Sequence, residues 1–129
     1  MRIQSKHYLF EWNDRKNRAF VKIFGFWEKP EDEPAFITDW EAIISRARKG
    51  FALLIDAREF LTPPQKVLKL ISEVQRMSIE IGVAKRAEIV PESFISSLAT
   101  QYAAKESGMW NLTRQFSSRE EAEKWLDEG

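Results

Sequence analysis

The residues of this sequence that could do chemistry follow one apolar segment, within FALLIDAREFLTPPQ. Residues 51–55 run without a polar break, which is typical of a strand buried on both faces. Asp56 ends the run, Arg58 follows it, and Thr62 precedes two prolines and a glutamine, a pattern that predicts a helix capped by Thr62. Ligands and partners of open α/β sheets meet the protein at the carboxyl ends of strands. We therefore expect function in the loop 56–62.

Each polar residue of this loop has two interpretations. The Thr62 hydroxyl could accept a phosphate, since a helix N-terminus stabilises anionic oxygens, or it could only cap the helix, the commoner role. Asp56 and Arg58 could form a polar site, or they could be a turn aspartate and a surface arginine. We keep Asp56, Arg58 and Thr62 as candidate partner-binding or phosphoacceptor residues, with Leu68 as a candidate contact on the exposed side of the helix that follows.

Catalytic and metal chemistry has little support in the sequence. There is no cysteine, and His7, the only histidine, falls on an expected edge strand without an evident nucleophile or second ligand. The carboxylates at 28–33 lack the spacing of a calcium loop, and no glycine-rich phosphate loop is present. We expect no enzyme, no catalytic residue, no cofactor and no metal.

Composition limits the class of protein. A length of 129 residues with 43% hydrophobic and 31% charged residues indicates one globular domain. Twenty basic side chains balance twenty acidic ones, which leaves no electrostatic footprint for nucleic acid. No apolar run approaches the roughly 20 residues of a membrane span, and the N-terminus lacks a signal peptide. We expect a cytoplasmic protein that does not bind nucleic acid and has no membrane span.

Hydrophobic periodicity predicts strands alternating with helices. Alternation at 7–12 and an apolar segment at 19–27 predict a hairpin, and helical spacing is found at 36–47, 63–81, 94–107 and 118–126. The predicted fold is α/β, a mixed and mostly parallel sheet of about five strands with four helices, in the order β-β-α-β-α-β-α-β-α. The third helix is placed by Phe94, Ile95, Leu98, Ala99 and Tyr102. The predicted core includes Val21, Ile23, Leu53, Leu54, Ile55, Ile71, Val74, Ile89 and Leu98.

Two further sets of residues are candidates for function. Glu88 lies within a short predicted strand, and a buried carboxylate is costly unless it is paired. We expect it to pair with Arg114 on the next strand; the alternative is a functional carboxylate.

Aromatic residues make up 12% of the chain, and most should lie in the core. The candidates for a ligand pocket or a partner surface are Trp27, Trp40, Tyr102 and Trp110.

Three stretches of the sequence resemble a known family. FALLIDAREF is similar to a buried strand ending in leucine and aspartate, KRAEIV to the strand after the second helix, and QFSSREEAEKWL to the closing segment of STAS domains. More narrowly, the chain resembles stand-alone SpoIIAA-like bacterial proteins, the anti-sigma-factor antagonists. In classical antagonists a phosphorylatable serine, followed by glycine, opens the helix after the central strand. Here the turn reads LTPPQ, and Thr62 is the nearest hydroxyl.

The resemblance implies a single SpoIIAA-like domain over residues 1–129. It implies a non-enzymatic regulatory module that binds a protein partner through the loop and helix start after the central strand. Lipid-carrying CRAL-TRIO domains share the same broad fold. An alternative function is therefore a carrier or sensor of a hydrophobic, lipid-like ligand held in an aromatic pocket.

Overall fold

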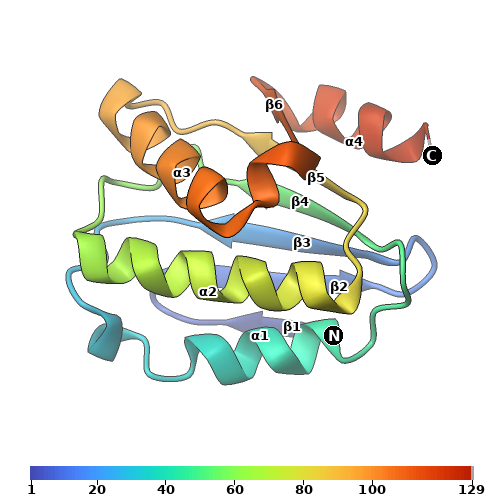
Figure 1. Ribbon diagram of the computed structural model, residues 1–129, viewed down its shortest axis with the longest axis horizontal. Helices are drawn as coiled ribbons and strands as arrows, with labels where there is room; N and C mark the ends of the chain where they lie inside the picture. The colour runs from blue at the N-terminus through green and yellow to red at the C-terminus, as the bar shows by residue number, and fades with distance from the viewer. Residues whose placement is uncertain (129) are drawn as a thin grey trace.

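The sheet of this protein has six strands, which lie side by side in the order of the chain (Figure 1). The structure is a computed structural model that describes residues 1–128. The strands are β1 (Arg2–Gln4), β2 (Tyr8–Asn13), β3 (Arg18–Ile23), β4 (Ala52–Asp56), β5 (Lys85–Ile89) and β6 (Thr113–Phe116). β1, β2 and β3 pair antiparallel, and β3 to β6 pair parallel. The predicted mixed, mostly parallel α/β sheet is confirmed.

The strand count of about five was wrong by one, because Arg2–Gln4 forms an edge strand too short to show an alternating pattern. Its presence also corrects the position of His7. The strand that follows His7, β2, lies between β1 and β3 and is not an edge strand.

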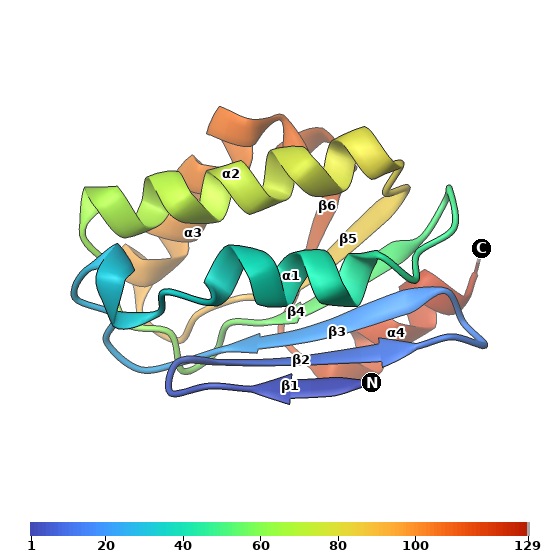
Figure 2. The ribbon, with the colours of Figure 1, turned by 90° about the horizontal axis from the view of Figure 1, so that it is seen from below.

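Helices cover the two faces of the sheet unequally (Figure 2). Three α-helices lie over one face, and α4 lies against the other face at β4 and β5. The α-helices are α1 (Phe36–Ile44), α2 (Gln65–Ile81), α3 (Phe94–Ser107) and α4 (Arg119–Asp127). Two short 3-10 helices, η1 (Pro30–Asp32) and η2 (Met109–Leu112), precede α1 and β6.

The alternation of side chains along each strand divides the core in two. On β4, Leu53 and Ile55 face the three helices, whereas Leu54 packs with Ala122 and Leu126 on the α4 side. The larger core also takes the aromatic side chains of β2. Seven of the nine predicted core residues are buried, and Ile71 is partly buried against the larger core.

Helix α2 begins later than predicted, at Gln65 and not at Pro63, and the reason is steric. A residue that precedes proline is excluded from the helical region, so Pro63, before Pro64, does not begin the helix. Pro64 occupies the N-cap position in extended geometry, and no side chain caps the helix. Thr62 lies two residues before the N-cap, so the prediction that it caps the helix was wrong. At the other end, Gly82 adopts φ 112° and ends α2 as predicted.

The orientation of α3 is the largest departure from the predictions. Its buried residues are Ser96, Thr100, Ala103 and Ala104. Four of the five residues that place the helix in the sequence are instead exposed: Phe94, Ile95, Leu98 and Tyr102. Leu98, assigned to the core, is 49% exposed. Small inner side chains let α3 approach α2 closely, so that the Ser72 hydroxyl on α2 donates to the carbonyl oxygen of Ala103 at 3.0 Å.

The register of β5 and β6 overturns the predicted pairing of Glu88 with Arg114. Glu88 lies opposite Gln115, and Arg114 lies opposite Ala87. Because neighbouring residues of a strand face opposite sides of a sheet, Arg114 is on the α4 side, where its guanidinium lies 5.9 Å from the Trp125 ring centre. The expected alignment was wrong by one residue.

Within residues 1–128, no helix combines the length and the apolar character that crossing a membrane would require.

Candidate functional site

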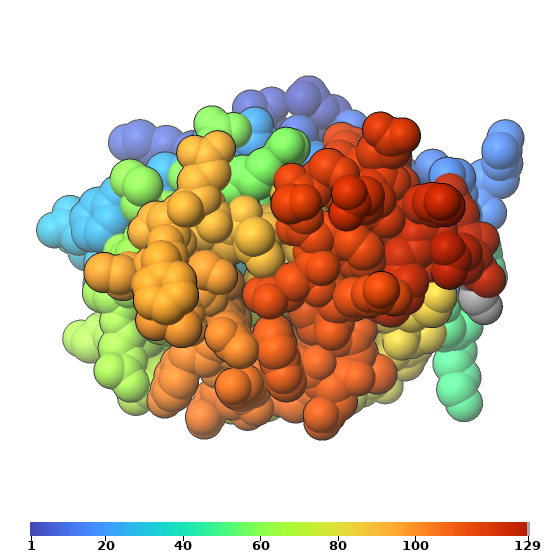
Figure 3. All heavy atoms as spheres, turned by 90° about the horizontal axis from the view of Figure 1, so that it is seen from above, coloured from blue at the N-terminus to red at the C-terminus, as the bar shows by residue number. Residues whose placement is uncertain are grey.

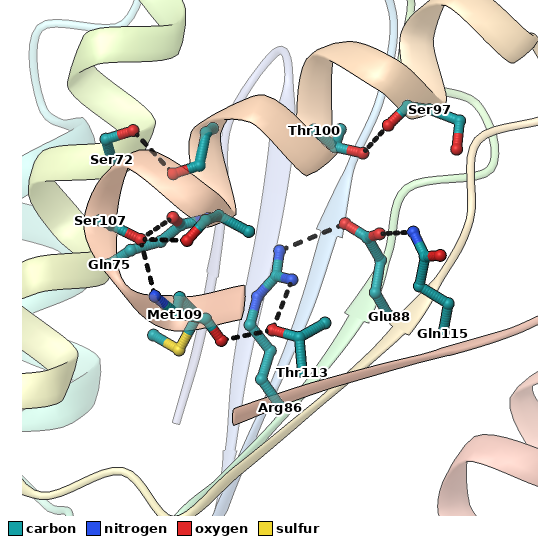
Figure 4. A network of polar contacts seen from close by, with 12 residues as sticks. Ser72, Gln75, Arg86, Glu88, Ser97, Thr100, Ser107, Met109, Thr113 and Gln115 are labelled. Atoms are coloured by element: carbon teal, nitrogen blue, oxygen red, sulfur yellow. Dashed lines mark hydrogen bonds and ion pairs between the residues drawn. The ribbon is translucent and has the colours of Figure 1, made fainter. Parts of the chain in front are cut away.

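A cavity of about 70 Å³ lies between the sheet and helix α2, with α3 at one end. Its walls are mostly apolar and come from strands β2 to β5 and helices α1 to α3. The aromatic side chains of Phe10, Phe36 and Trp40 belong to the walls supplied by β2 and α1. Polar side chains line the part near α3, where β5 contributes Arg86 and Glu88 (Figure 4). The cavity therefore has an apolar part and a polar part.

Arg86 and Glu88 form the polar wall on the sheet side. Spaced by two on β5, they face the helices, while Ala87 and Ile89 face α4. Both are buried, with side chains 6% and 1% exposed, and their nearest charged atoms, Arg86 Nη2 and Glu88 Oε2, are 3.3 Å apart. From β6, Gln115 donates to the second Glu88 oxygen at 3.0 Å, and Arg86 donates to the Thr113 hydroxyl at 3.4 Å.

The helices supply the opposite polar wall. Gln75 of α2 accepts a 2.6 Å hydrogen bond from the Ser107 hydroxyl, and the Thr100 hydroxyl donates to the carbonyl oxygen of Ser97 at 3.0 Å. The first bond joins α3 to α2, and the second lies within α3. Among the described residues, no hydrogen bond joins Gln75, Thr100 or Ser107 to Arg86 or Glu88. Within residues 1–128 the side-chain partners of the ion pair thus come from β5 and β6 alone (Figure 4), and both of its residues line the cavity.

The predicted loop 56–62 forms a second polar cluster at the carboxyl end of β4. Arg58 donates to both carboxylate oxygens of Asp56, from Nε at 3.0 Å and from Nη2 at 2.8 Å. Burial acts to raise the pKa of Asp56, but the hydrogen bonds and charge of Arg58 outweigh it and hold the pKa below its ordinary value. These two hydrogen bonds fix the orientation of the Arg58 guanidinium, and the Arg58 side chain is 42% exposed. Arg58 therefore presents a pre-oriented cation at the surface.

Thr62 connects this loop to α3. Its hydroxyl oxygen lies 2.8 Å from that of Ser96, a side chain that is 1% exposed on the inner face of α3. Thr62 itself is exposed. The structure therefore places the candidate phosphoacceptor at the junction of the loop and the helix, and not at the cap of α2.

An exposed apolar surface lies on α3, which crosses the face of the molecule shown in Figure 3. We call it the α3 stripe, and it consists of Phe94, Ile95, Leu98 and Tyr102. The exposed fractions of these four residues are 75%, 64%, 49% and 52%. Leu61, beside Thr62 in the loop, is 52% exposed. The loop and α3 thus present apolar side chains on the outside of the protein.

Only one of the four aromatic pocket candidates, Trp40, lines the cavity. Trp27 is fully buried and stacks on His7, with ring centres 6.1 Å apart. Trp110 is partly buried beside Lys105, and Tyr102 belongs to the exposed stripe. The aromatic candidates do not form a common pocket.

The structure also corrects the position of Leu68 and adds two polar residues to the wall of the cavity. Leu68 lines the cavity and is not on the outer side of α2. Arg86 and Gln75 were missed as site residues. Arg86 was not assigned to the short strand predicted around Glu88, and polar residues of an amphipathic helix are ordinarily assigned to its outer face. The signal for Arg86 was its spacing of two from Glu88.

His7 has a buried partner that the sequence did not reveal. Its Nδ1 lies 3.0 Å from a Glu33 oxygen, which also accepts a hydrogen bond from the His7 backbone N–H at 2.8 Å. Among residues 1–128, histidine and carboxylate side chains form no group of three or more that could hold a metal ion.

In comparisons with known proteins, no family model and no curated sequence matches this chain.

Proposed function

We propose that this protein is a non-enzymatic regulatory module that binds a protein partner through the α3 stripe and the loop 56–62. The observation that carries the proposal is the orientation of α3, which buries small and polar residues and leaves Phe94, Ile95, Leu98 and Tyr102 exposed. Contiguous apolar surface of this kind is typical of interaction sites on soluble proteins.

The composition of the surface supports a protein as the partner. Aromatic side chains and arginine contribute most to protein–protein affinity when they are buried at the centre of an interface. The stripe offers Phe94 and Tyr102, and the loop offers Arg58, whose orientation is fixed by Asp56. A pre-oriented side chain loses less conformational entropy on binding.

The resemblance of the sequence to SpoIIAA-like STAS domains also supports the binding of a protein partner. Such domains meet their partners around the loop and helix that follow the central strand. The corresponding segment here, 56–62, lies at the carboxyl end of β4 and is joined to α3 by the Thr62–Ser96 hydrogen bond. We therefore place the protein, as a proposal, among regulatory modules of that kind.

A capture experiment with matched variants tests the proposal. The tagged protein is used to capture partners from a lysate of its own host, beside the double variant Phe94→Ser/Leu98→Ser and the control Ile81→Ser. Ile81 is also an exposed apolar residue, 40% accessible, but it lies at the end of α2. We expect a protein that is retained by wild type and control and lost by the double variant. Equal capture by all three would contradict the proposal.

The alternative, a carrier of a lipid-like ligand, is favoured by the apolar walls of the cavity. Its volume of about 70 Å³ is about half that of a cavity that admits benzene. A lipid chain would require α2 or α3 to move outward. Native mass spectrometry of protein purified from its own host distinguishes the two functions, because only a carrier should retain a lipid-sized mass.

A further inference from the structure

We propose that the cavity beneath α2 and α3 binds a small, uncharged molecule that has an amide or hydroxyl head and a short hydrocarbon body. The head would lie against Arg86 and Glu88, and the body against the neighbouring apolar wall. Arg86 and Glu88 do not belong to the docking surface of the proposed function, although Ala57 and Phe60 of the loop 56–62 also line the cavity. The test of this site does not depend on finding a protein partner.

Unused hydrogen-bonding capacity indicates where the head would bind. A guanidinium carries five N–H donors, and the hydrogen bonds from Arg86 to Glu88 and Thr113 are long, at 3.3 and 3.4 Å. Each Glu88 oxygen accepts one hydrogen bond, from Arg86 or from Gln115, and has a free lone pair. Donor and acceptor sites therefore stand side by side at the cavity wall.

The charges of this wall select an uncharged head. The positive charge of Arg86 and the negative charge of Glu88 cancel, and the side chains facing them from the helices, Gln75 and Thr100, are neutral. A carboxylate would be repelled by Glu88 and an ammonium by Arg86, and either ion would lose its hydration. A primary amide instead offers a carbonyl oxygen to Arg86 and an N–H to Glu88.

The rest of the cavity selects the body. Leu53 and Ile55 are the β4 neighbours of Arg86 and Glu88 in the sheet, and Val74 of α2 lines the same cavity. A cavity of about 150 Å³ admits the six carbons of benzene, so about 70 Å³ corresponds to roughly three to four non-hydrogen atoms once the walls adjust. The ligand is therefore a short chain with one polar end.

A purely structural role explains the ion pair less well. A buried ion pair contributes no more stability than apolar side chains of similar volume, because desolvation offsets the attraction between the charges. Here the pair also has long hydrogen bonds and lies beside unfilled space. Polar groups that face an otherwise apolar cavity are typical of a ligand site.

Three probe molecules that share a methyl body and differ in their heads test the proposal: acetamide, acetate and methylammonium. Each is titrated into the protein while amide NMR signals of β5 and α3 are followed. We expect saturable shifts with acetamide, and affinities at least about tenfold weaker for the two ions, because each ion meets one like charge. Glu88→Gln should reverse this order for acetate, which then meets only Arg86. The control Glu73→Gln, on the exposed side of α2, should leave all three affinities unchanged.

Two outcomes would overturn the proposal. Absence of saturable shifts with every probe molecule would mean that the cavity holds only solvent. Equal affinities for the three probe molecules would mean that the apolar wall alone binds them and that Arg86 and Glu88 do not distinguish between their heads. If Glu88→Gln fails to fold, the order of affinities measured on the wild-type protein decides.

Discussion

At the scale of single residues, the Thr62 hydroxyl joins the loop 56–62 to α3 through its 2.8 Å contact with Ser96. Thr62→Val keeps the shape of the side chain but removes this hydrogen bond. We expect the free energy of unfolding to fall by about 0.5–1.5 kcal/mol, since the buried Ser96 hydroxyl loses its partner. Urea denaturation measures the loss, and Thr62→Ser, which keeps the hydroxyl, should lose less. Equal losses in the two variants would exclude the hydrogen bond as the cause.

Asp56 should make stability depend on pH at the acid end. Arg58 lowers the pKa of Asp56 in the folded protein below its ordinary value of 3.8, although burial acts in the opposite direction. A lowered pKa means that the Asp56–Arg58 contribution is present above about pH 4 and is lost as pH falls through the folded pKa. The stability difference between wild type and Asp56→Asn should therefore be largest near neutral pH and shrink below about pH 4. A difference that grows on acidification would contradict the assignment.

Arg86 and Glu88 should be strongly coupled in a double-mutant cycle. Glu88→Leu leaves the buried Arg86 charge without its carboxylate, and we expect it to cost about 3–5 kcal/mol. Arg86→Met/Glu88→Leu removes both charges, and apolar replacements of a buried pair are often neutral. The double variant should therefore be more stable than Glu88→Leu alone in urea denaturation. Simple addition of the two single losses would argue against coupling.

At the scale of the elements, a matched pair of leucines tests the orientation of α3. Leu54 is 1% exposed between β4 and α4, and Leu98 is 49% exposed on the α3 stripe. Leu54→Ala should cost about 2–5 kcal/mol, whereas Leu98→Ala should change stability by about 0.5 kcal/mol or less. Thermal or urea unfolding of the two variants gives both values. Similar large losses would place Leu98 in a core.

The existence of most elements could be predicted because their patterns are local. The buried run of β4 and the glycine at the end of α2 act within a few residues. The face that α3 buries could not be predicted in this way. The apolar side of a helix ordinarily faces the core, but here Ser96, Thr100 and Ala103 are buried, and Ala103 accepts a hydrogen bond from Ser72 of α2. Which face of α3 is buried therefore depends on the surface of α2 and the core against which α3 packs.

The candidate site was predictable only in part for the same reason. Asp56, Arg58 and Thr62 lie close together in the sequence, so their place at and after the carboxyl end of β4 follows from the position of that strand alone. The cavity residues Gln75, Arg86 and Glu88 come from separate elements, and their meeting depends on strand register. A shift of one residue between β5 and β6 was enough to assign Glu88 the wrong partner.

At the scale of the whole molecule, the loop, the α3 stripe and the cavity all involve the layer of helices on one face of the sheet (Figure 2). The opposite face carries only α4 among the described helices. The central claim is that a partner protein docks on the helical layer at α3. An equivalent contact at α4 is not expected.

Site-specific photo-crosslinking tests this claim most directly. A photoreactive phenylalanine analogue is placed at position 94 on the α3 stripe and, as a control, at the exposed position 120 on α4, and each protein is irradiated inside its own host. The expected result is a discrete, heavier adduct at position 94 that contains one partner protein and is absent at position 120. No adduct at position 94, or the same adducts at both positions, would contradict the account.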